Sequence, residues 1–342
     1  MTPGDGAVRT PAATRRVTVL GFADLYGWAE DDHRAALEAF RPTCGGLPAE
    51  WVGIAARADT LNPGDERSFF ERWFRPVLIE DGAPALFTGY YEPELDAALE
   101  RSARFRVPLY RVPPEMPGDG PWLTRTQIED GALAGRGLEL AWVEDEVEAF
   151  FLQVQGSGRL RLRDGRVLRL GYAGKNGHPY SSVGRMVIAR GALPAEGASA
   201  DAVRAWLRRN PGEGRAVMRA NASFVFFREL DLAPGTGPLG TMGQPVTPLR
   251  SLAVDPGVVP LGAPAWVETE GPEFLRRLMV AQDTGSAIKG AQRADIFVGT
   301  GEAAGRRAGR IRDGGRLVVL WPVGLCPGDR TGTGARQAAG PS

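Results

Sequence analysis

The sequence predicts a mainly β protein with short helices, built from a closed barrel and a smaller, separate middle unit. Of its 342 residues, 46 are Gly and 27 are Pro, a composition typical of short strands joined by many turns. Strand-like segments follow one another through the C-terminal third, which favours a closed barrel over a doubly wound sheet. No G-x-G-x-x-G motif follows a strand and no P-loop is present, so we expect no nucleotide cofactor.

The N-terminal part is predicted to hold two helices and a strand. Helical spacing with acids in the first turn marks residues 28–40, and a similar helix start opens "NPGDERSFFERWFRPVLI". The second segment carries an aromatic face that we expect in the core, formed by Phe69, Phe70, Trp73 and Phe74. Residues 85–95 are strand-like until Pro93 interrupts the pattern.

The middle of the chain reads as a unit of its own. "RFRVPLYRVP" predicts a strand, and Thr124 with Gln127 forms a capping-box pattern at a helix start. "FFLQVQGSGRLRLRDGRVLRLGYAG" alternates, and predicts two strands around an Asp164-Gly165 turn. Helical segments are expected at about 182–190 and 201–209.

Arginines cluster along this predicted hairpin at a spacing of two. A solvated strand face is the favoured interpretation, ahead of a phosphate-binding patch. The residues are Arg159, Arg161, Arg163, Arg166 and Arg169.

Strands return in the C-terminal third. They are expected in "NASFVFFREL", "PLRSLAVD", "PAWVET", "RLMVAQD", "ADIFVG" and "GRLVVLWP", with one short helix at about 302–309.

Composition excludes several classes of function. The 41 basic and 41 acidic residues cancel, so neither nucleic acid nor an anionic membrane is predicted as partner. Two cysteines, Cys44 and Cys326, lie too far apart in sequence for a metal cluster or disulfide framework. With only two histidines, His33 and His178, zinc chemistry and a Ser-His-Asp triad are both poorly supplied. We therefore expect no metal.

The ends of the chain carry little structural signal. No run of about 18 apolar residues occurs, so no transmembrane segment is predicted. The apolar run near the N-terminus is broken at Asp24 and lacks a small-residue cleavage site, and no lipobox cysteine follows it. A signal peptide or lipid anchor is therefore not supported within these residues. Residues 1–16 and 326–342 are expected to be flexible tails.

Four glycine-rich stretches are predicted to line a long polar groove: "FTGYYEPE", "QVQGSG", "GYAGKNGHPYSS" and "DTGSAIKGAQRAD". Their glycines permit close approach of a ligand to the backbone. Their tyrosines offer faces for sugar rings. Their Gln, Asn and Ser side chains suit hydroxyls and acetamides.

The proton-transfer groups of this set are aspartates. A buried carboxylic acid can protonate a glycosidic oxygen if its pKa is raised. Ordinary glycosidases need a second carboxylate. Asp283 can fill that role beside Asp295, or can be a structural acceptor in the "DTG" turn, and spacing leaves both open.

Four motifs, in order, resemble the MltA family of lytic murein transglycosylases: "FTGYYEP", "FFLQVQGSG", "GYAGKNGHPY" and "DTGSAIKG…RADIFVGTG". The resemblance covers about residues 17–323. The C-terminal part also resembles the 3D domain, whose three aspartates would be Asp255, Asp283 and Asp295. Ser286 stands where the family more often has glycine, a change we expect to be tolerated.

The resemblance implies a fold of two domains with a groove between them. A double-psi β-barrel would comprise residues 17–96 and 223–323. A smaller β-rich, glycan-binding domain would be inserted at 97–222.

The resemblance also implies a reaction. The family cleaves the β-1,4 bond between N-acetylmuramic acid and N-acetylglucosamine in peptidoglycan without water, leaving 1,6-anhydromuramoyl products. Asp295 would serve as acid and then base, Asp283 would support it, and Asp255 would be structural. Contacts to the glycan are expected from Thr88, Gly89, Tyr90, Gln155, Gly156, Ser157, Lys175, Asn176, Tyr180, Gly285 and Lys289.

Two rival functions stay open: a hydrolase using the Asp283–Asp295 pair, and a non-catalytic glycan-binding protein. The family implies peptidoglycan glycan strands as partner, possible contacts with cell-wall synthesis or turnover proteins, and a place in the periplasm or at the outer-membrane periphery. Lys289 is predicted to point away from Asp295, since a cation there would lower the pKa of the acid. Backbone carbonyls, Asp283 and substrate are its expected partners.

Overall fold

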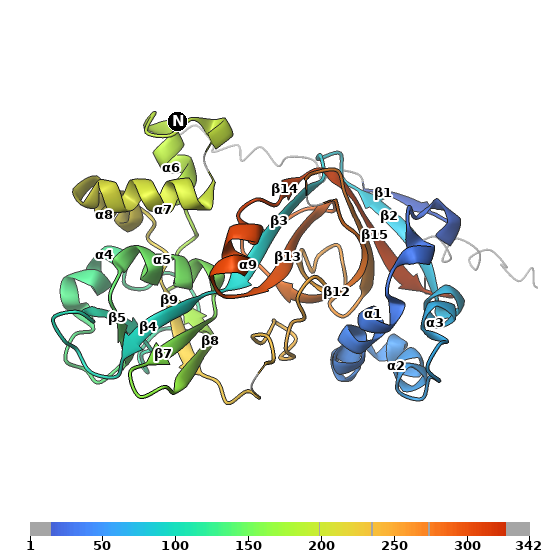
Figure 1. Ribbon diagram of the computed structural model, residues 1–342, viewed down its shortest axis with the longest axis horizontal. Helices are drawn as coiled ribbons and strands as arrows, with labels where there is room; N and C mark the ends of the chain where they lie inside the picture. The colour runs from blue at the N-terminus through green and yellow to red at the C-terminus, as the bar shows by residue number, and fades with distance from the viewer. Residues whose placement is uncertain (1–14, 198, 234, 273, 326–342) are drawn as a thin grey trace, which may run out of the picture.

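The chain forms two β-sheets, one curved into a nearly closed barrel and one carrying most of the longer loops and helices (Figure 1). The structure is a computed structural model, and it describes residues 15–325 except 198, 234 and 273. Mainly strand with short helices, it confirms the predicted fold class.

The barrel sheet has nine strands in the order β1-β2-β15-β11-β12-β10-β13-β3-β14. Two of its pairs are parallel, β10 with β12 and β13 with β3. The strands are β1 (Arg16–Val19), β2 (Phe74–Glu80), β3 (Leu86–Glu92), β10 (Ser251–Val254), β11 (Pro264–Thr269), β12 (Arg276–Thr284), β13 (Arg293–Thr300), β14 (Arg312–Asp313) and β15 (Gly315–Pro322).

Helices of the N-terminal part pack against this sheet through aromatic residues. They are α1 (His33–Phe40), α2 (Val52–Asp59) and α3 (Glu66–Trp73), joined by 3-10 turns at Phe22–Asp24, Trp28–Glu30, Arg41–Gly46 and Ala49–Trp51. Phe69, Phe70 and Phe74 are at most 2% exposed and contact one another and Phe40 edge-on or tilted. Three residues of the predicted aromatic face are therefore core, and Trp73 is partly buried beside them.

The predicted helix at 28–40 is interrupted. A 3-10 turn covers its first residues, and α1 begins only after Asp32, whose Oδ1 accepts a hydrogen bond from the Ala35 amide at 3.0 Å. The side-chain cap fixes the start of α1 because it satisfies an amide that has no partner inside the helix.

The second sheet has six strands in the order β5-β6-β4-β7-β8-β9. They are β4 (Glu94–Ala98), β5 (Val107–Tyr110), β6 (Glu139–Val143), β7 (Gly158–Leu162), β8 (Val167–Lys175) and β9 (Val225–Glu229). The predicted hairpin at Asp164-Gly165 joins β7 and β8, and Gly165 has a positive φ of 86°. Its turn needs glycine because other residues are strained there.

Helices surround this second sheet. They are α4 (Arg125–Gln127), α5 (Glu146–Gln155), α6 (Val183–Ala189), α7 (Ala200–Arg209) and α8 (Pro211–Ala220), with a π turn at Ile128–Ala132 and a 3-10 turn at Ala195–Gly197. Thr124 and Gln127 form the predicted capping box. The remaining helix, α9 (Gly301–Ala308), packs on β3 and β13 of the barrel.

The chain passes between the two sheets at β3 and β4, which only Pro93 separates (Figure 1). It returns to the barrel after β9. The second sheet thus spans 94–229: β4 begins three residues before the range 97–222 expected for an inserted domain, and β9 follows the end of that range.

One element was predicted wrongly. The segment "FFLQVQ" was expected to be strand, but it is the second half of α5. Asp145 caps the helix start through the Val147 amide at 2.7 Å, and Gly156 ends it in the left-handed conformation. A short apolar run is compatible with either a strand or a buried helix. Here the residues that cap the two ends favour the helix.

The arginine prediction was also wrong for two residues. Arg161 and Arg166 are exposed and pair with Asp96 and Asp164, as a solvated face requires. Arg159 and Arg169 instead point at Glu92, which is 1% exposed. Strand alternation places Arg159 and Arg161 on the same face of β7, opposite the core residue Leu160. Near β3 this face is covered, because Glu92 accepts hydrogen bonds from Arg159 and Arg169 there.

Candidate active site

Asp283 and Asp295 lie in one row across four strands of the barrel. In the ladder register Asp283 of β12 stands opposite Ala253 of β10, Ala253 opposite Asp295 of β13, and Asp295 opposite Thr88 of β3. We call these four residues the carboxylate row. The backbones of the two aspartates are two strand spacings apart, about 9–10 Å. Only the small Ala253 stands between them.

A register shift helps to make this row. β10 and β12 pair regularly up to Leu252 and Ala281, then Ala253 pairs with Asp283, so Gln282 is skipped. Gln282 is buried and bonded to Ser251 and to the Ala39 carbonyl. Such an irregularity re-aims side chains and is common beside active sites.

Asp295 has one free carboxylate oxygen. Its Oδ1 accepts a hydrogen bond from the Thr88 hydroxyl at 2.5 Å, and no residue in the described part of the chain donates to Oδ2. Arg293 does not pair directly with Asp295, but its Nη2 donates to the Thr88 Oγ1 at 2.8 Å. The carboxylate stays partly accessible, so its second oxygen is available to a substrate.

Asp283 is held on both oxygens. Oδ1 accepts from the Thr241 amide at 2.9 Å, the Thr241 hydroxyl at 2.8 Å and the Thr284 amide at 2.9 Å. Oδ2 accepts from the Tyr90 hydroxyl at 3.1 Å. Four donors leave this carboxylate little capacity to abstract a proton.

Burial governs the electrostatics of the pair. It raises the pKa of Asp295, opposed by the Thr88 hydrogen bond and the Arg293 charge and reinforced by the charge of Asp283. Burial also raises the pKa of Asp283, against the bonds from Thr241, Thr284 and Tyr90. The pKa of Tyr90 is raised by burial and by both aspartates, so it remains a donor. Burial therefore favours the protonated form of Asp295 more than in an exposed aspartate.

The residues expected from "FTGYYEP" divide between two tasks. Thr88 and Tyr90 reach the aspartates. Gly89 serves packing, because a Cβ there would lie 2.8 Å from the Ala308 Cα of α9. Gln155 accepts from the Tyr91 amide at 3.1 Å and so ties the end of α5 to β3.

Beside Gln155, Gly156 has a φ of 78° at the end of α5, and Ser157 is 8% exposed. They follow Gln155, which bonds to β3, and precede β7 of the second sheet.

Asn176 differs most from the sequence expectation. It is 1% exposed, accepts from the Phe224 amide at 2.8 Å, and donates to the Leu123 and Ala222 carbonyls at 2.7 and 2.8 Å. The hydrogen bonds of its side-chain amide are already formed with backbone groups, so Asn176 fixes the loop instead of binding a ligand. Its neighbours in the motif, Lys175 and Tyr180, are exposed.

Lys289 lies on the loop after β12 with 62% of its side chain exposed, and its ion-pair partner in the described chain is Asp255, at 3.6 Å. This partner was not among those expected. Asp255 also accepts from the Gly290 and Gly257 amides. Its partial burial is outweighed by these bonds and by Lys289, so its pKa is lowered. Gly285 begins the same loop, packed on Ile288. Asp255 therefore anchors the loop, in agreement with a structural role.

Sequence reasoning missed Thr241 and Arg293. Arg293 stands two residues before Asp295 on one strand, so strand alternation alone places both on one face. Thr241 is 42 residues from Asp283 in a segment without a regular pattern, and no local signal marks it.

The described residues contain no group of three or more His, Cys, Asp or Glu side chains that could hold a metal ion. Cys44 is a free thiol, and Cys326 lies outside the described residues. Among the helices that the structure describes, none has the length and apolarity needed to cross a bilayer.

Comparison with known proteins gives a consistent assignment. Residues 86–228 match the MltA-specific insert domain and residues 250–321 match the 3D domain. Membrane-bound lytic murein transglycosylase A of Escherichia coli K12 is 38% identical over 244 residues, which are 68% of this chain. The chain spans 65% of the length of that relative.

A second relative and a solved structure extend the match. Membrane-bound lytic murein transglycosylase A of Vibrio cholerae is 35% identical over 289 residues, covering 81% of this chain and 74% of the relative. The crystal structure of E. coli MltA with bound chitohexaose has a TM-score of 0.72 and 30% identity, covering 87% of this chain and 90% of that one. The chain belongs to the MltA family of lytic murein transglycosylases.

Proposed function

We propose that this protein is a peptidoglycan lytic transglycosylase that cleaves the bond between N-acetylmuramic acid and N-acetylglucosamine. One observation carries the proposal: of the two aspartates in the carboxylate row, only Asp295 combines a raised pKa with a free oxygen. A single acid of this kind fits a reaction whose nucleophile belongs to the substrate. The names of the relatives fit the same substrate.

In the proposed reaction Asp295 gives its proton to the glycosidic oxygen, and the bond from that oxygen to C1 of the muramoyl residue breaks. The C6 hydroxyl oxygen of the same residue then bonds to C1, and its proton passes back to Asp295. No water is consumed, the product is a 1,6-anhydro sugar, and the acid is restored. The charge that remains on Asp295 between the two steps is accommodated by Thr88 and Arg293.

Asp283 is proposed to position the site. Three of its four hydrogen bonds hold Tyr90 and Thr241 beside the row. The glycan is proposed to lie between the barrel and the second sheet, as an inserted glycan-binding domain would require. The exposed Lys175 and Tyr180 would contact it from the second sheet. The chitohexaose bound to the E. coli relative supports an oligosaccharide ligand.

A hydrolase remains the main alternative, because the spacing of the row is compatible with it. In inverting glycosidases the two carboxyl groups lie about 6.5–9.5 Å apart, close to two strand spacings. Mass spectrometry of digested peptidoglycan separates the two reactions. Anhydro-ended fragments support transglycosylation, whereas fragments one water heavier with reducing ends would refute it. Absence of any product with intact binding would identify a glycan-binding protein.

Thr88→Val is expected to move the alkaline limb of kcat/KM to higher pH. The acid must be protonated, so activity falls as pH rises through the pKa of Asp295. The Thr88 hydroxyl stabilises the charged carboxylate, and its loss raises that pKa further. Rates measured from about pH 4 to about pH 9, which brackets ordinary carboxyl pKa values, test this.

The matched control is Thr300→Val, which removes a hydroxyl from β13 that bonds Glu92 instead. The alkaline limb of kcat/KM for this control should lie at the same pH as in the wild type. A downward shift in Thr88→Val would show that Arg293, once released from Thr88, controls the acid.

We also propose that the protein works in the cell envelope, at the periplasmic face where peptidoglycan lies. Both named relatives are described as membrane-bound. Fractionation of cells producing the full-length protein, with detection of the chain in periplasmic and membrane fractions, tests the location.

A further inference from the structure

The second sheet carries a cavity that is distinct from the carboxylate row. Its volume is about 760 Å³, and β5, β6, α4, α5 and α8 supply its walls. No residue of the barrel sheet lines it. Any ligand bound here is therefore held by the second sheet and its helices alone.

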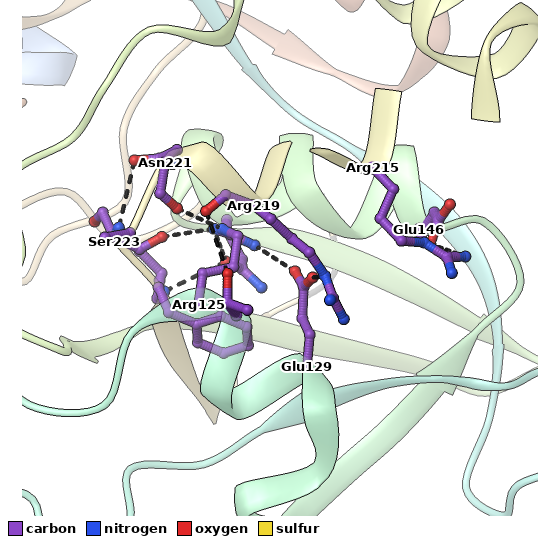
Figure 2. A network of polar contacts seen from close by, with 12 residues as sticks. Arg125, Glu129, Glu146, Arg215, Arg219, Asn221 and Ser223 are labelled. Carbon is purple, nitrogen blue, oxygen red and sulfur yellow. Dashed lines mark hydrogen bonds and ion pairs between the residues drawn. The ribbon is translucent and has the colours of Figure 1, made fainter. Parts of the chain in front are cut away.

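One wall consists of ion pairs that are complete within the protein. Arg125 is 3% exposed and donates to the Asn221 and Ser223 carbonyls and to the Gln153 Oε1 (Figure 2). Around it, Glu129 pairs with Arg219, and Glu146 with Arg215. Because these charges are already matched, the wall is rigid and contributes little free charge to a ligand.

Two buried side chains keep a polar atom free. Tyr110 is 4% exposed and Gln153 is 6% exposed, and both line the cavity. The Gln153 Oε1 is occupied by Arg125 and the Val225 amide, which leaves its Nε2 as donor. Across the described residues, neither this Nε2 nor the Tyr110 hydroxyl has a protein partner, and neither is sealed from solvent. Because both atoms face the open cavity, a ligand bound there can form hydrogen bonds with them without breaking a contact within the protein.

The rim carries uncompensated cations. Arg101 and Arg106 are exposed lining residues, and no acid in the described part of the chain forms an ion pair with either. Arg101 lies over the Trp142 ring at 6.0 Å. Glu139 is the one lining carboxylate without an ion pair among the described residues. The free charge is thus two cations against one anion.

We propose that this cavity binds the stem peptide of peptidoglycan, with a peptide carboxylate at Arg101 and Arg106. Tyr110 and Gln153 then bond peptide amide groups, and Phe150 and Phe224 contact its apolar side chains. Guanidinium groups prefer carboxylates and hold them with two parallel bonds. A chitin-type glycan has no carboxylate to pair with the two cations, and a phosphate would lie against Glu139. The assignment rests on the proposed function, since that names peptidoglycan as substrate.

Isothermal titration of the whole protein with free stem tetrapeptide tests the assignment. We expect binding to the wild type, and at least tenfold weaker binding for Arg101→Gln/Arg106→Gln, because each charged bond contributes about 1.5–3 kcal/mol and a tenfold change is about 1.4 kcal/mol. Tyr110→Phe should weaken binding by a smaller factor. The same tetrapeptide with its C-terminal carboxylate amidated should also bind less well.

The control is Arg166→Gln/Arg185→Gln, which removes two exposed arginines of the same sheet and helices that do not line the cavity. It should bind the peptide as the wild type does. Equal affinity in the rim variant and this control, or no binding of the wild type at millimolar peptide, would overturn the assignment.

Peptide-free glycan separates this inference from the proposed function. The rim variant should cleave bare glycan at the wild-type rate and lose only the preference for peptide-bearing strands. Anhydro products without any peptide binding overturn the cavity assignment alone. Peptide binding without anhydro products overturns the proposed reaction and leaves the cavity as a peptide site.

Discussion

Asp295→Asn is expected to lower kcat by about 10²–10⁴-fold, the usual contribution of a positioned acid or base, with little change in glycan binding. The amide keeps the shape of the carboxylate and can still accept from Thr88, but it carries no proton to give. Turnover of purified peptidoglycan, followed by release of anhydro fragments, measures kcat. Binding of a non-cleaved chitooligosaccharide measures affinity.

The stability of this variant is its internal control. Burial raises the folded-state pKa of Asp295 above its unfolded value. The free energy of unfolding is therefore highest when Asp295 is protonated, and it falls as pH rises through the folded-state pKa. At neutral pH Asn removes this penalty, and the melting temperature should equal or exceed that of the wild type. A variant that loses activity because it unfolds would instead melt earlier. Full activity in a folded variant would exclude Asp295 as the acid.

Asp283→Asn gives the matched comparison within the carboxylate row. Its oxygens accept from four donors, so an amide that must turn one N–H toward a donor disturbs Tyr90 or Thr241. We expect a smaller loss of kcat than for Asp295→Asn. If the two variants lost activity equally and the products carried reducing ends, the paired-carboxylate hydrolase would be the better description.

Glu92→Gln is expected to lower the free energy of unfolding by about 3–5 kcal/mol, the effect of leaving buried charge without its partner. Glu92 is 1% exposed and accepts from Arg159 at 2.8 Å, Arg169 at 3.1 Å and the Thr300 hydroxyl at 2.9 Å. The amide cannot neutralise two guanidinium groups. Thermal unfolding followed by circular dichroism measures the change.

Glu302→Gln provides the control for Glu92. It removes the carboxylate of an exposed pair with Arg306 on α9, and such pairs add little to stability, so the melting temperature should hardly move. Equal melting of both variants would show that the Glu92 cluster does not hold β7 and β8 to β3.

The sequence predicted where most strands lie, but it did not predict which strands pair with one another. Short apolar runs between turns placed the strands of the C-terminal third, because most residues of these strands are buried. The partners of a strand depend on chain segments far away, so the row that joins Asp283, Ala253, Asp295 and Thr88 could not be read from spacing. The contact between Thr241 and Asp283 could not be predicted for the same reason.

Polar residues misled where burial was not visible in the sequence. In the sequence, an Asn in a glycine-rich loop is compatible with two roles: binding a ligand, or holding the loop from a buried position. Asn176 has the second role, since its side chain bonds three backbone groups. Arg159 and Arg169 look like surface charges on a hairpin. Only the structure shows that Glu92 of β3 covers part of this hairpin face and forms a buried polar cluster with them. The aspartates were easier, because their motif is long and its order along the chain is specific.

The irregularity at Gln282 sets the position of an active-site residue without determining the framework of the barrel. In a regular ladder Gln282 would stand opposite Ala253, and Asp283 would fall one place further along, away from Tyr90. The sheet itself would keep its strand order and its core. A one-residue slip of β12 against β10 would therefore take Asp283 out of the carboxylate row while leaving Asp295 and the strand order of the barrel in place.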